Sequence, residues 1–250
     1  MSKSTSWGKV ANWYNNLIEK SKDSYQRKLI LPNLIRLLAI KKGEVLLDLG
    51  CGQGFFCQEF AKLGAKVIGV DISEELINIA KKDKSVTYHV SQAHKLDFMQ
   101  SKSVDKIAII LSLQNVENAN EVIKEVSRVL KPNGKFFMVL NHPAFRIPKR
   151  SSWGWDDTLK TQYRRLDGYL SQSTGQIQMH PGAKPWEMTI SFHRPLQFYF
   201  KILSKNDFLI SRLEEWNSHK VSGPGPKKEA ENKARKEFPL FLFLEAVKLA

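Results

Sequence analysis

Cysteine is scarce in this chain of 250 residues, which contains only Cys51 and Cys57. Five residues separate the two, and no cluster of His or Cys surrounds them, so the sequence excludes a disulfide framework and a structural zinc site. Long hydrophobic runs are also missing: the N-terminus has no apolar signal segment, and no window reaches the roughly eighteen apolar residues of a membrane span. These absences predict a soluble, cytoplasmic protein that binds no metal and no membrane.

Acidic residues are outnumbered, with 25 Asp and Glu against 39 Lys and Arg and a net charge of +14. Residues 48–141 are nearly balanced, with 12 basic and 11 acidic residues, whereas 1–47 carry 9 against 3 and 142–250 carry 18 against 11. Basic ends of this kind leave RNA open as a partner. They also suit a surface that only keeps a protein in solution, which is the commoner reason for such an excess.

Short apolar runs alternate with helical patterns through the centre of the chain. Five runs predict strands buried on both faces of a sheet, because each is nearly continuous and ends in turn residues. They span 44–50, 66–72, 86–90, 105–113 and 135–141. Helical segments separate the strands, which predicts an α/β fold with right-handed crossovers and a parallel sheet covered by helices on both faces.

The two ends of the chain predict additions to this core. Apolar residues at helical spacing in 9–40 predict two helices, with Pro32 interrupting. After Asn141, about fifty residues rich in Trp, Tyr, Arg, Gly and Pro are too long for an ordinary connection and predict a lid. The remaining expected elements are a hairpin of 176–179 and 188–192, a helix from Pro195, a strand 208–213, a polar linker 222–237 and a last strand 240–244. We expect one domain in four parts: a helical cap (1–42), a core (43–141), a lid (142–194) and a C-terminal part (195–250).

Three alternating glycines end the run from Val45 to Gly54 (VLLDLGCGQG). Glycine allows positive φ and leaves no side chain in the way, so a ligand can lie against the backbone at the end of the strand. A dinucleotide fingerprint would need glycine where Phe55 stands, and a phosphate loop would need a Lys-Ser or Lys-Thr pair that does not follow. The turn therefore predicts a nucleotide-type site that is neither of these.

Two segments carry a resemblance to a known family. Residues 48–54 (DLGCGQG) resemble the first motif of class I S-adenosylmethionine-dependent methyltransferases, and residues 67–71 (VIGVD) resemble the second. The resemblance covers about residues 43–141. It implies a Rossmann-like fold with a doubly wound, mostly parallel seven-stranded sheet whose last strand is antiparallel. It also implies S-adenosyl-L-methionine as the cofactor of a methyltransferase.

The resemblance assigns roles to individual residues. Asp71 stands where the family has the acid that binds both ribose hydroxyls, and Asp48 where it has the acid near the methionine amino group. A carboxylate suits both partners. Trp13 and Tyr14 lie where small-molecule methyltransferases often carry a helix that covers the cofactor. The other cofactor contacts that the resemblance implies are Gly50, Cys51, Gly52, Gly54, Ile72, Gln92, Ala93 and Leu111.

The methyl acceptor leaves fewer marks in the sequence. His142 and His193 are the candidate catalytic bases, because many O- and N-acceptors must lose a proton. A histidine at the end of a strand or helix is, however, more often a hydrogen-bonded structural residue. The lid and the N-terminal helices suit the enclosure of a small-molecule acceptor, which is the function we predict. An RNA or protein methyltransferase and a non-catalytic nucleotide-binding protein of the same fold remain alternatives.

Overall fold

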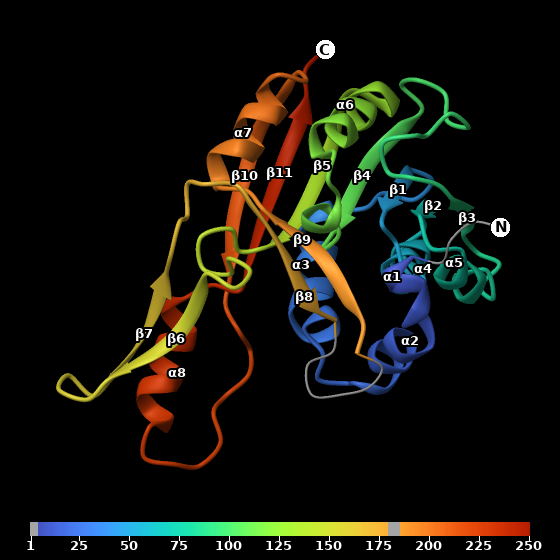
Figure 1. Cartoon of the computed structure of the whole chain (residues 1–250). Coiled ribbons are helices and arrows are strands. Elements are labelled where there is room, and N and C mark those ends of the chain that lie inside the picture. The colour runs from blue at the N-terminus through green and yellow to red at the C-terminus, as the bar shows by residue number, and fades with distance from the viewer. Residues whose placement is uncertain (1–4, 180–185) are drawn as a thin grey trace.

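A central sheet of seven strands organises the molecule (Figure 1). The computed structural model describes residues 5–179 and 186–250. The strand order is β3-β2-β1-β4-β5-β11-β10, in which β11 runs antiparallel to both neighbours and the other pairs are parallel. The predicted fold class is confirmed. The strands are β1 (Val45–Leu49), β2 (Lys66–Asp71), β3 (Thr87–Val90), β4 (Val104–Ile110), β5 (Leu130–Asn141), β10 (Phe208–Trp216) and β11 (Phe241–Lys248).

Helices cover both faces of the sheet. Successive strand residues point to opposite sides, so each strand contributes side chains to both faces. Leu46 belongs to one buried cluster with residues of α3 (Leu31–Leu38), α4 (Phe55–Lys62) and α5 (Glu74–Ala80). Leu47 belongs to a second cluster with residues of α6 (Ala119–Val129) and α7 (Leu196–Ser204). Two apolar clusters of this kind are what a doubly wound sheet buries.

The N-terminal cap consists of α1 (Ser6–Lys9), α2 (Ala11–Lys20), the π-helical turn η1 (Gln26–Ile30) and α3. The expectation that Pro32 interrupts the helices is wrong: Pro32 lies in the first turn of α3, directly after η1. A proline lacks the N–H of an ordinary i to i−4 bond, and at the start of a helix that donor is not needed. The break in the cap falls instead between α2 and η1.

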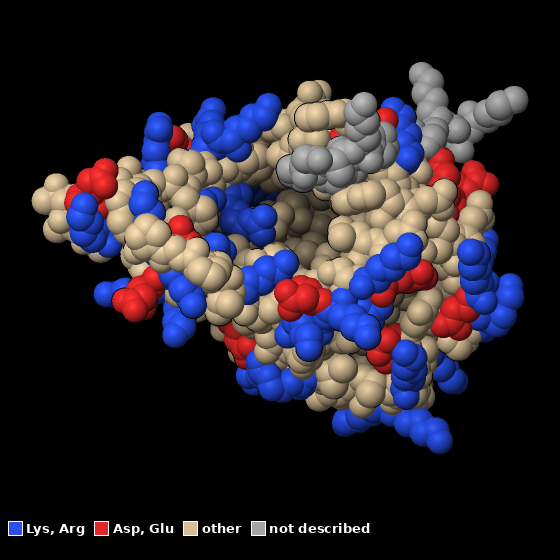
Figure 2. All heavy atoms as spheres, turned by 90° about the horizontal axis from the view of Figure 1, so that it is seen from below, with Lys and Arg blue, Asp and Glu red and all other residues tan. Residues whose placement is uncertain are grey.

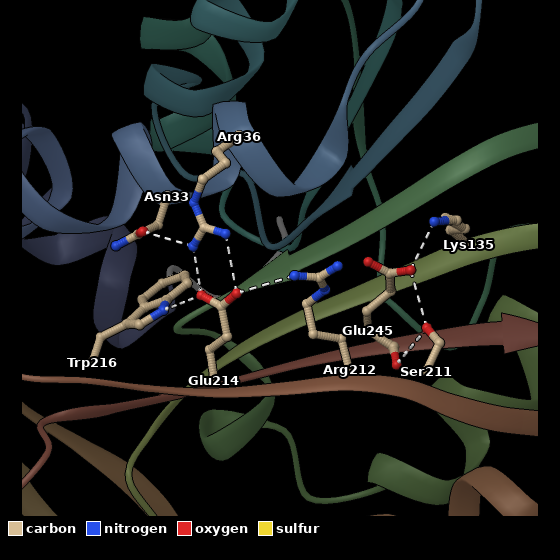
Figure 3. A network of polar contacts seen from close by, with 8 residues as sticks. All are labelled: Asn33, Arg36, Lys135, Ser211, Arg212, Glu214, Trp216 and Glu245. Atoms are coloured by element: carbon tan, nitrogen blue, oxygen red, sulfur yellow. Dashed lines mark hydrogen bonds and ion pairs between the residues drawn. The ribbon is translucent and has the colours of Figure 1, made fainter.

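A polar network fastens the cap to the last strands (Figure 3). The Arg36 guanidinium of α3 donates to both carboxylate oxygens of Glu214 on β10, at 3.1 and 2.6 Å. The Trp216 indole N–H donates to the same carboxylate at 3.1 Å. Beside it, the buried Glu245 carboxylate of β11 accepts from Lys135 of β5 at 2.7 Å. The cap is therefore tied to the end of the chain through side chains more than a hundred residues apart.

The insertion after β5 forms two hairpins, which Figure 1 shows below the sheet. The predicted hairpin is confirmed as β8 (Ser173–Gln178) and β9 (Met188–His193), and the sequence analysis missed β6 (Ser151–Asp156) and β7 (Thr161–Leu166). The prediction of a polar linker is wrong in its second half, which forms α8 (Lys228–Glu237) against β7. Its composition is almost wholly polar, so α8 lacks the apolar stripe that usually marks a surface helix.

Strand boundaries also differ from prediction. The turn before the fifth strand lies inside β5 as a bulge, between Leu130, which pairs with Val104, and Lys135, which pairs with Lys106. β10 and β11 extend beyond their predicted ends to Trp216 and Lys248. Within residues 5–179 and 186–250, no helix has the length and apolarity needed to span a membrane.

Candidate functional site

The glycine turn follows β1 at the edge where the parallel strands end. Gly50, Gly52 and Gly54 have φ angles of +72°, +58° and +87°, a region that side chains other than glycine rarely adopt. A Cβ on Gly50 would collide with the Ser112 hydroxyl. The N–H groups of Gly50 and Cys51 both donate to the Val70 carbonyl, at 2.7 and 3.0 Å. The turn is thus folded back onto β2, and the three glycines contribute no side chains of their own to it.

Asp71, the last residue of β2, holds this turn in place. Its two carboxylate oxygens accept hydrogen bonds from the N–H groups of Gly52 and Ser73, each at 2.9 Å. Burial raises the pKa of Asp71, while these N–H donors act to lower it. A carboxylate has about four lone-pair sites, so at least one acceptor position remains for a ligand. The half-exposed Ile72 follows directly and borders the same turn.

Asp48 lies on β1 beneath the turn and is almost fully buried. Its Oδ2 accepts from the Cys57 thiol of α4 at 3.3 Å, whereas its Oδ1 has no hydrogen-bond partner among the described residues. Burial raises the pKa of Asp48 to about 7. A buried carboxylate oxygen without a partner is costly, and a cationic ligand group at this place would offset that cost.

Tyr14 of α2 covers the glycine turn from the cap. Its Cε1 lies 3.6 Å from the position that a Cβ on Gly52 would take, and its ring meets Trp7 edge-on at 5.4 Å between centroids. Burial and the negative charges of Asp71 and Asp48 raise the pKa of Tyr14 to about 12. The cap therefore closes over the two acids, where the sequence placed a covering helix.

The ends of β3 and β4 border the same edge. The Ser91 N–H donates to the Asp71 carbonyl at 2.9 Å, which brings the exposed Gln92 and the half-buried Ala93 beside the end of β2. Leu111 follows β4 with a φ of +54°, and its N–H donates to Val139 at 2.8 Å. The structure thus gathers all the predicted cofactor contacts along four neighbouring strand ends, in the order β3-β2-β1-β4.

The two candidate bases lie farther along this edge and differ in their surroundings. His142 Nδ1 accepts from the N–H groups of Ala144 and Phe145, at 3.2 and 3.4 Å, so its Nε2 carries the hydrogen and donates to Glu215 at 2.7 Å. Both ring nitrogens of His142 are therefore engaged within the protein, which does not favour a role as base. Burial lowers the pKa of His142, against the effect of Glu215.

His193 ends β9 and is also buried. Its Nε2 lies 2.7 Å from the Tyr169 carbonyl, and a carbonyl can only accept, so Nε2 carries the hydrogen and Nδ1 keeps a lone pair. Burial lowers the pKa of His193, which keeps the ring neutral near pH 7. His193 therefore has a ring nitrogen that can take up a proton, whereas both ring nitrogens of His142 are engaged in hydrogen bonds.

A cavity of about 230 Å³ lies beside His193, between the ends of β4 and β5 and the insertion. Figure 2 looks onto this edge from below and shows a hollow whose wall carries Lys and Arg side chains. β4 is the strand next to β1, and neighbouring strands lie about 4.8 Å apart, so the cavity begins one strand away from the glycine turn. Its polar lining includes Gln114, Arg146, Arg164, His193 and Arg194.

Comparison with known proteins decides the family. Residues 47–138 match the model of a family described as "Methyltransferase domain". A solved S-adenosylmethionine dependent methyltransferase from Mesorhizobium loti has a TM-score of 0.69, with 26% identity, and the match covers 87% of this chain and 96% of that chain. Residues 47–138 therefore form a methyltransferase domain of the class I S-adenosylmethionine-dependent family. S-Adenosylmethionine is the methyl donor of this family.

Curated relatives of this methyltransferase chain include enzymes named for quinones. A "Ubiquinone biosynthesis O-methyltransferase" from Xanthomonas oryzae pv. oryzae is 31% identical over 126 residues, which are 46% of this chain and 53% of that protein. A "Demethylmenaquinone methyltransferase" from Tropheryma whipplei is 34% identical over 113 residues, which are 43% of this chain and 46% of that protein. The chain spans about half the length of the curated relatives it matches.

The residues at the edge where the parallel strands end fit the family's cofactor. The orphaned oxygen of Asp48 suits an ammonium, the spare lone pairs of Asp71 suit hydroxyls, and the bare turn at Gly52 leaves room beside the backbone. In the described ranges 5–179 and 186–250, no cluster of three or more His, Cys, Asp or Glu side chains is arranged to hold a metal ion.

Sequence reasoning missed part of the site. Cys57 was given no role in the site, although its thiol lies within hydrogen-bonding distance of Asp48. The arginines of the cavity were missed as a group, because they come from three separate segments, after β5, on β7 and between β9 and α7. One signal was available: the charge count placed the largest basic excess outside the core, in the same part of the chain.

Proposed function

We propose that this protein is an S-adenosylmethionine-dependent methyltransferase that acts on a small-molecule acceptor. The observation that carries the proposal is the buried, unpartnered carboxylate oxygen of Asp48 beneath a turn of glycines with positive φ. This arrangement has an uncompensated cost in the free protein and is suited to a ligand that joins a cation to a nucleoside. The quinone methyltransferases among the relatives support a small acceptor by analogy.

Each cofactor contact has a physical reason. Asp48 would bind the amino group of the methionine moiety, and Asp71 would accept from the ribose hydroxyls with the lone pairs that its two N–H donors leave free. The main chain of Gly50, Cys51, Gly52 and Gly54 would line the space between them. The adenine would lie against Ile72, Gln92, Ala93 and Leu111.

The bound cofactor supplies a methyl group on a sulfonium, which a nucleophile can take by in-line displacement. The protein's contribution is then to hold the acceptor in line in a space with little water, and positioning of this kind can contribute about 7 to 11 kcal/mol. The cap with Tyr14 and the insertion with His193 enclose the edge from two sides. We assign both to the exclusion of water.

His193 is the better placed of the two predicted bases. It borders the cavity, its tautomer leaves Nδ1 with a lone pair, and burial lowers its pKa so that the neutral form is the common one at pH 7. His142 would instead hold the turn at Ala144 against Glu215. A catalytic role of His142 and an RNA partner both stay predictions.

The proposal is tested by binding and turnover. Calorimetry with S-adenosylhomocysteine should show one site per chain, and labelled S-adenosylmethionine should transfer its methyl group to members of a panel of small phenols and quinols. Gly52→Val should abolish binding, because its side chain would enter the space beneath Tyr14. The matched control is Gly43→Val, which has a similar positive φ of +86° but no atom within 4 Å of its Cβ.

The control separates backbone strain from obstruction. If Gly43→Val and Gly52→Val lose the same affinity, the effect is one of stability and the cofactor does not lie on the turn. Full affinity without transfer to any acceptor or to tRNA would favour the non-catalytic alternative.

A further inference from the structure

We propose that the methyl acceptor carries an oxyanion, a carboxylate or a phosphate, which Arg146 and Arg164 bind in the cavity beside His193. The inference rests on the proposed function, because it treats this cavity as the acceptor site. The cavity is lined by three arginines and a histidine, and no Asp or Glu contributes to its lining. A small cavity with cations on its wall and no acid selects anions by simple electrostatics.

The arginines of the cavity have neutral partners where they have any. Arg164 donates to the Phe145 carbonyl at 2.9 Å and to the Ser151 hydroxyl at 2.8 Å. Arg194 donates to main-chain carbonyls at 2.7 to 3.4 Å. Arg164 is thus held in position without neutralisation, since a carbonyl or hydroxyl orients a guanidinium but does not cancel its charge, whereas the charge of Arg194 also interacts favourably with Glu117.

Arg146 is the least occupied of the three. Among residues 5–179 and 186–250 its guanidinium has no side-chain hydrogen bond or ion pair, and its recorded contact is with the Phe241 ring, 5.8 Å away. The remaining residues, 1–4 and 180–185, include no Asp or Glu, so they hold no hidden side-chain carboxylate. Its five N–H donors are therefore available to a ligand, and a guanidinium matches the planar geometry of carboxylate and phosphate oxygens.

The charges of the cavity repel one another in the free protein. Desolvation lowers the pKa of Arg146, of Arg164 and of Arg194. Arg146 and Arg164 line the same cavity, and the charge of Arg146 lowers the pKa of Arg164 further. An anion between them would offset both the desolvation and the repulsion.

Gln114 adds a second requirement at the cofactor side of the cavity. Its Nε2 donates to the Leu111 carbonyl at 2.7 Å, which fixes the orientation of the amide. Its Oε1 is buried and has no partner among the described residues. An unpartnered hydrogen-bond acceptor calls for a donor on the ligand. We therefore expect the methylated molecule to carry a hydroxyl or amine that faces Gln114 and an oxyanion that faces the arginines.

The test uses three small aromatic probes of similar shape on protein saturated with S-adenosylhomocysteine. The probes are 4-hydroxybenzoate, 4-hydroxyphenyl phosphate and the neutral 4-hydroxybenzamide, titrated by NMR. We expect at least one oxyanion to bind about tenfold more tightly than the amide or better, as charge-assisted hydrogen bonds require. The stronger of the two identifies a carboxylate or a phosphate as the group that is recognised.

Arg146→Gln should remove most of this discrimination, and Lys149→Gln is the matched control, since Lys149 is exposed and does not line the cavity. Arg164→Gln should act similarly but also loses contacts to Phe145 and Ser151. The inference is overturned if neither oxyanion binds better than the amide, if neither binds at all, or if Lys149→Gln loses as much as Arg146→Gln.

Binding of S-adenosylhomocysteine, measured separately, distinguishes the two proposals. If it binds normally and the oxyanions show no preference, the inference about the acceptor fails and the proposed function stands. If it does not bind, the proposed function fails first.

Discussion

Asp48, which we propose to bind the cofactor, also affects the stability of the fold through its ionisation. Its carboxylate is buried under the glycine turn with one oxygen unpaired, and its pKa is raised to about 7. The folded state therefore binds a proton more tightly than the unfolded chain, where an ordinary Asp titrates near pH 4. The contribution of Asp48 to stability is full below about pH 4 and is lost as the pH rises through about 7.

Asp48→Asn should therefore separate stability from binding. The amide keeps the shape and an acceptor for Cys57 but places no charge in the interior, so the free protein should be more stable than the wild type at pH 8. Affinity for S-adenosylhomocysteine should fall by about ten- to a hundredfold, because a charge-assisted hydrogen bond is lost. Thermal unfolding without ligand and calorimetry with ligand measure the two effects.

The same group predicts how affinity depends on pH. In the wild type, affinity for S-adenosylhomocysteine should rise with pH until Asp48 is ionised, and at pH 5.5 it should be about thirtyfold weaker than at pH 8. Asp48→Asn should flatten this dependence. A wild-type profile that is flat from pH 5.5 to pH 8 would contradict the pairing of Asp48 with the ligand's ammonium.

Asp71 has two tasks that one substitution can resolve. It accepts from Gly52 and Ser73, and we propose that it also binds the ribose. The wild type should bind adenosine more tightly than 2′,3′-dideoxyadenosine, and Asp71→Asn should lose most of that difference, as a double-mutant cycle would measure. Stability should also fall, by about 1 to 3 kcal/mol, because one N–H of the turn loses its acceptor.

Asp83→Asn is the matched control for Asp71→Asn. Asp83 likewise accepts from an N–H and a hydroxyl two residues on, but it lies on the exposed surface after α5. Its variant should leave the preference for adenosine unchanged. An Asp71→Asn protein that still prefers adenosine over the dideoxy analogue by the wild-type factor would exclude the ribose assignment.

At the scale of residues, the sequence predicted which residues belong to the site better than it predicted what they contact. Asp48 and Asp71 could be placed because each ends or nearly ends a strand beside glycines. That Asp71 orients the glycine turn, or that Cys57 reaches Asp48 from the first turns of α4, depends on how helix and strand meet in space. Sequence spacing carries no such information, because side-chain direction is set only after the elements pack.

At the scale of elements, an apolar pattern decided which predictions succeeded. The five central strands were predictable because a strand buried on both faces must be almost wholly apolar. α8 was read as a linker because its residues are mainly Lys, Glu, Ala and Asn, with buried Ala234 alone to mark a packed side in the described structure. β6 and β7 were missed because neither strand contains a buried residue, so neither has the apolar run that marks a strand of the central sheet.

The contact between α3 and β10 leads to a prediction about how these two elements hold together. Glu214→Gln should weaken the paired hydrogen bonds from Arg36 (Figure 3), but the Arg36 side chain is 52% exposed, so solvent screens most of the attraction. We expect the free energy of unfolding, measured in urea, to fall by about 1 kcal/mol or less. Affinity for S-adenosylhomocysteine should not change, because none of these residues lines the glycine turn.

Glu59→Gln provides the control for this loss. It breaks an exposed ion pair with Lys62 within α4, at 2.8 Å, and should cost less than Glu214→Gln, which also affects Trp216. Equal losses would mean that the contact between cap and strand adds nothing to an ordinary surface pair. A marked loss of ligand affinity in Glu214→Gln would instead show that the position of α3 against β10 affects the proposed cofactor site.

At the scale of the whole molecule, the topology gathers the site at one edge. Parallel strands end on the same side, so acids and glycines that are far apart in the chain meet there. The sequence could predict this edge from the alternation of strands and helices. Only the resemblance to the family indicated that the cap returns to this edge at Tyr14. The sequence could not predict that Asn115 fastens the insertion there by donating to the Ile190 carbonyl at 2.8 Å. Contacts of such long range leave no local pattern.

Because the edge joins the core, cap and insertion, ligand binding should stabilise the protein as a unit. S-Adenosylhomocysteine at a hundred times its dissociation constant adds about 2.7 kcal/mol to the folded state. For a chain of 250 residues this corresponds to a rise in Tm of about 5 to 11 °C.

Gly52→Val should show no rise in Tm at the same ligand concentration, and Gly43→Val, with a strained backbone but an open edge, should show the full rise. Since Asp48 must be ionised to pair with the ammonium, the wild-type rise at a fixed ligand concentration should be smaller at pH 5.5 than at pH 8. A rise that is the same in both glycine variants would mean that the ligand binds away from the turn.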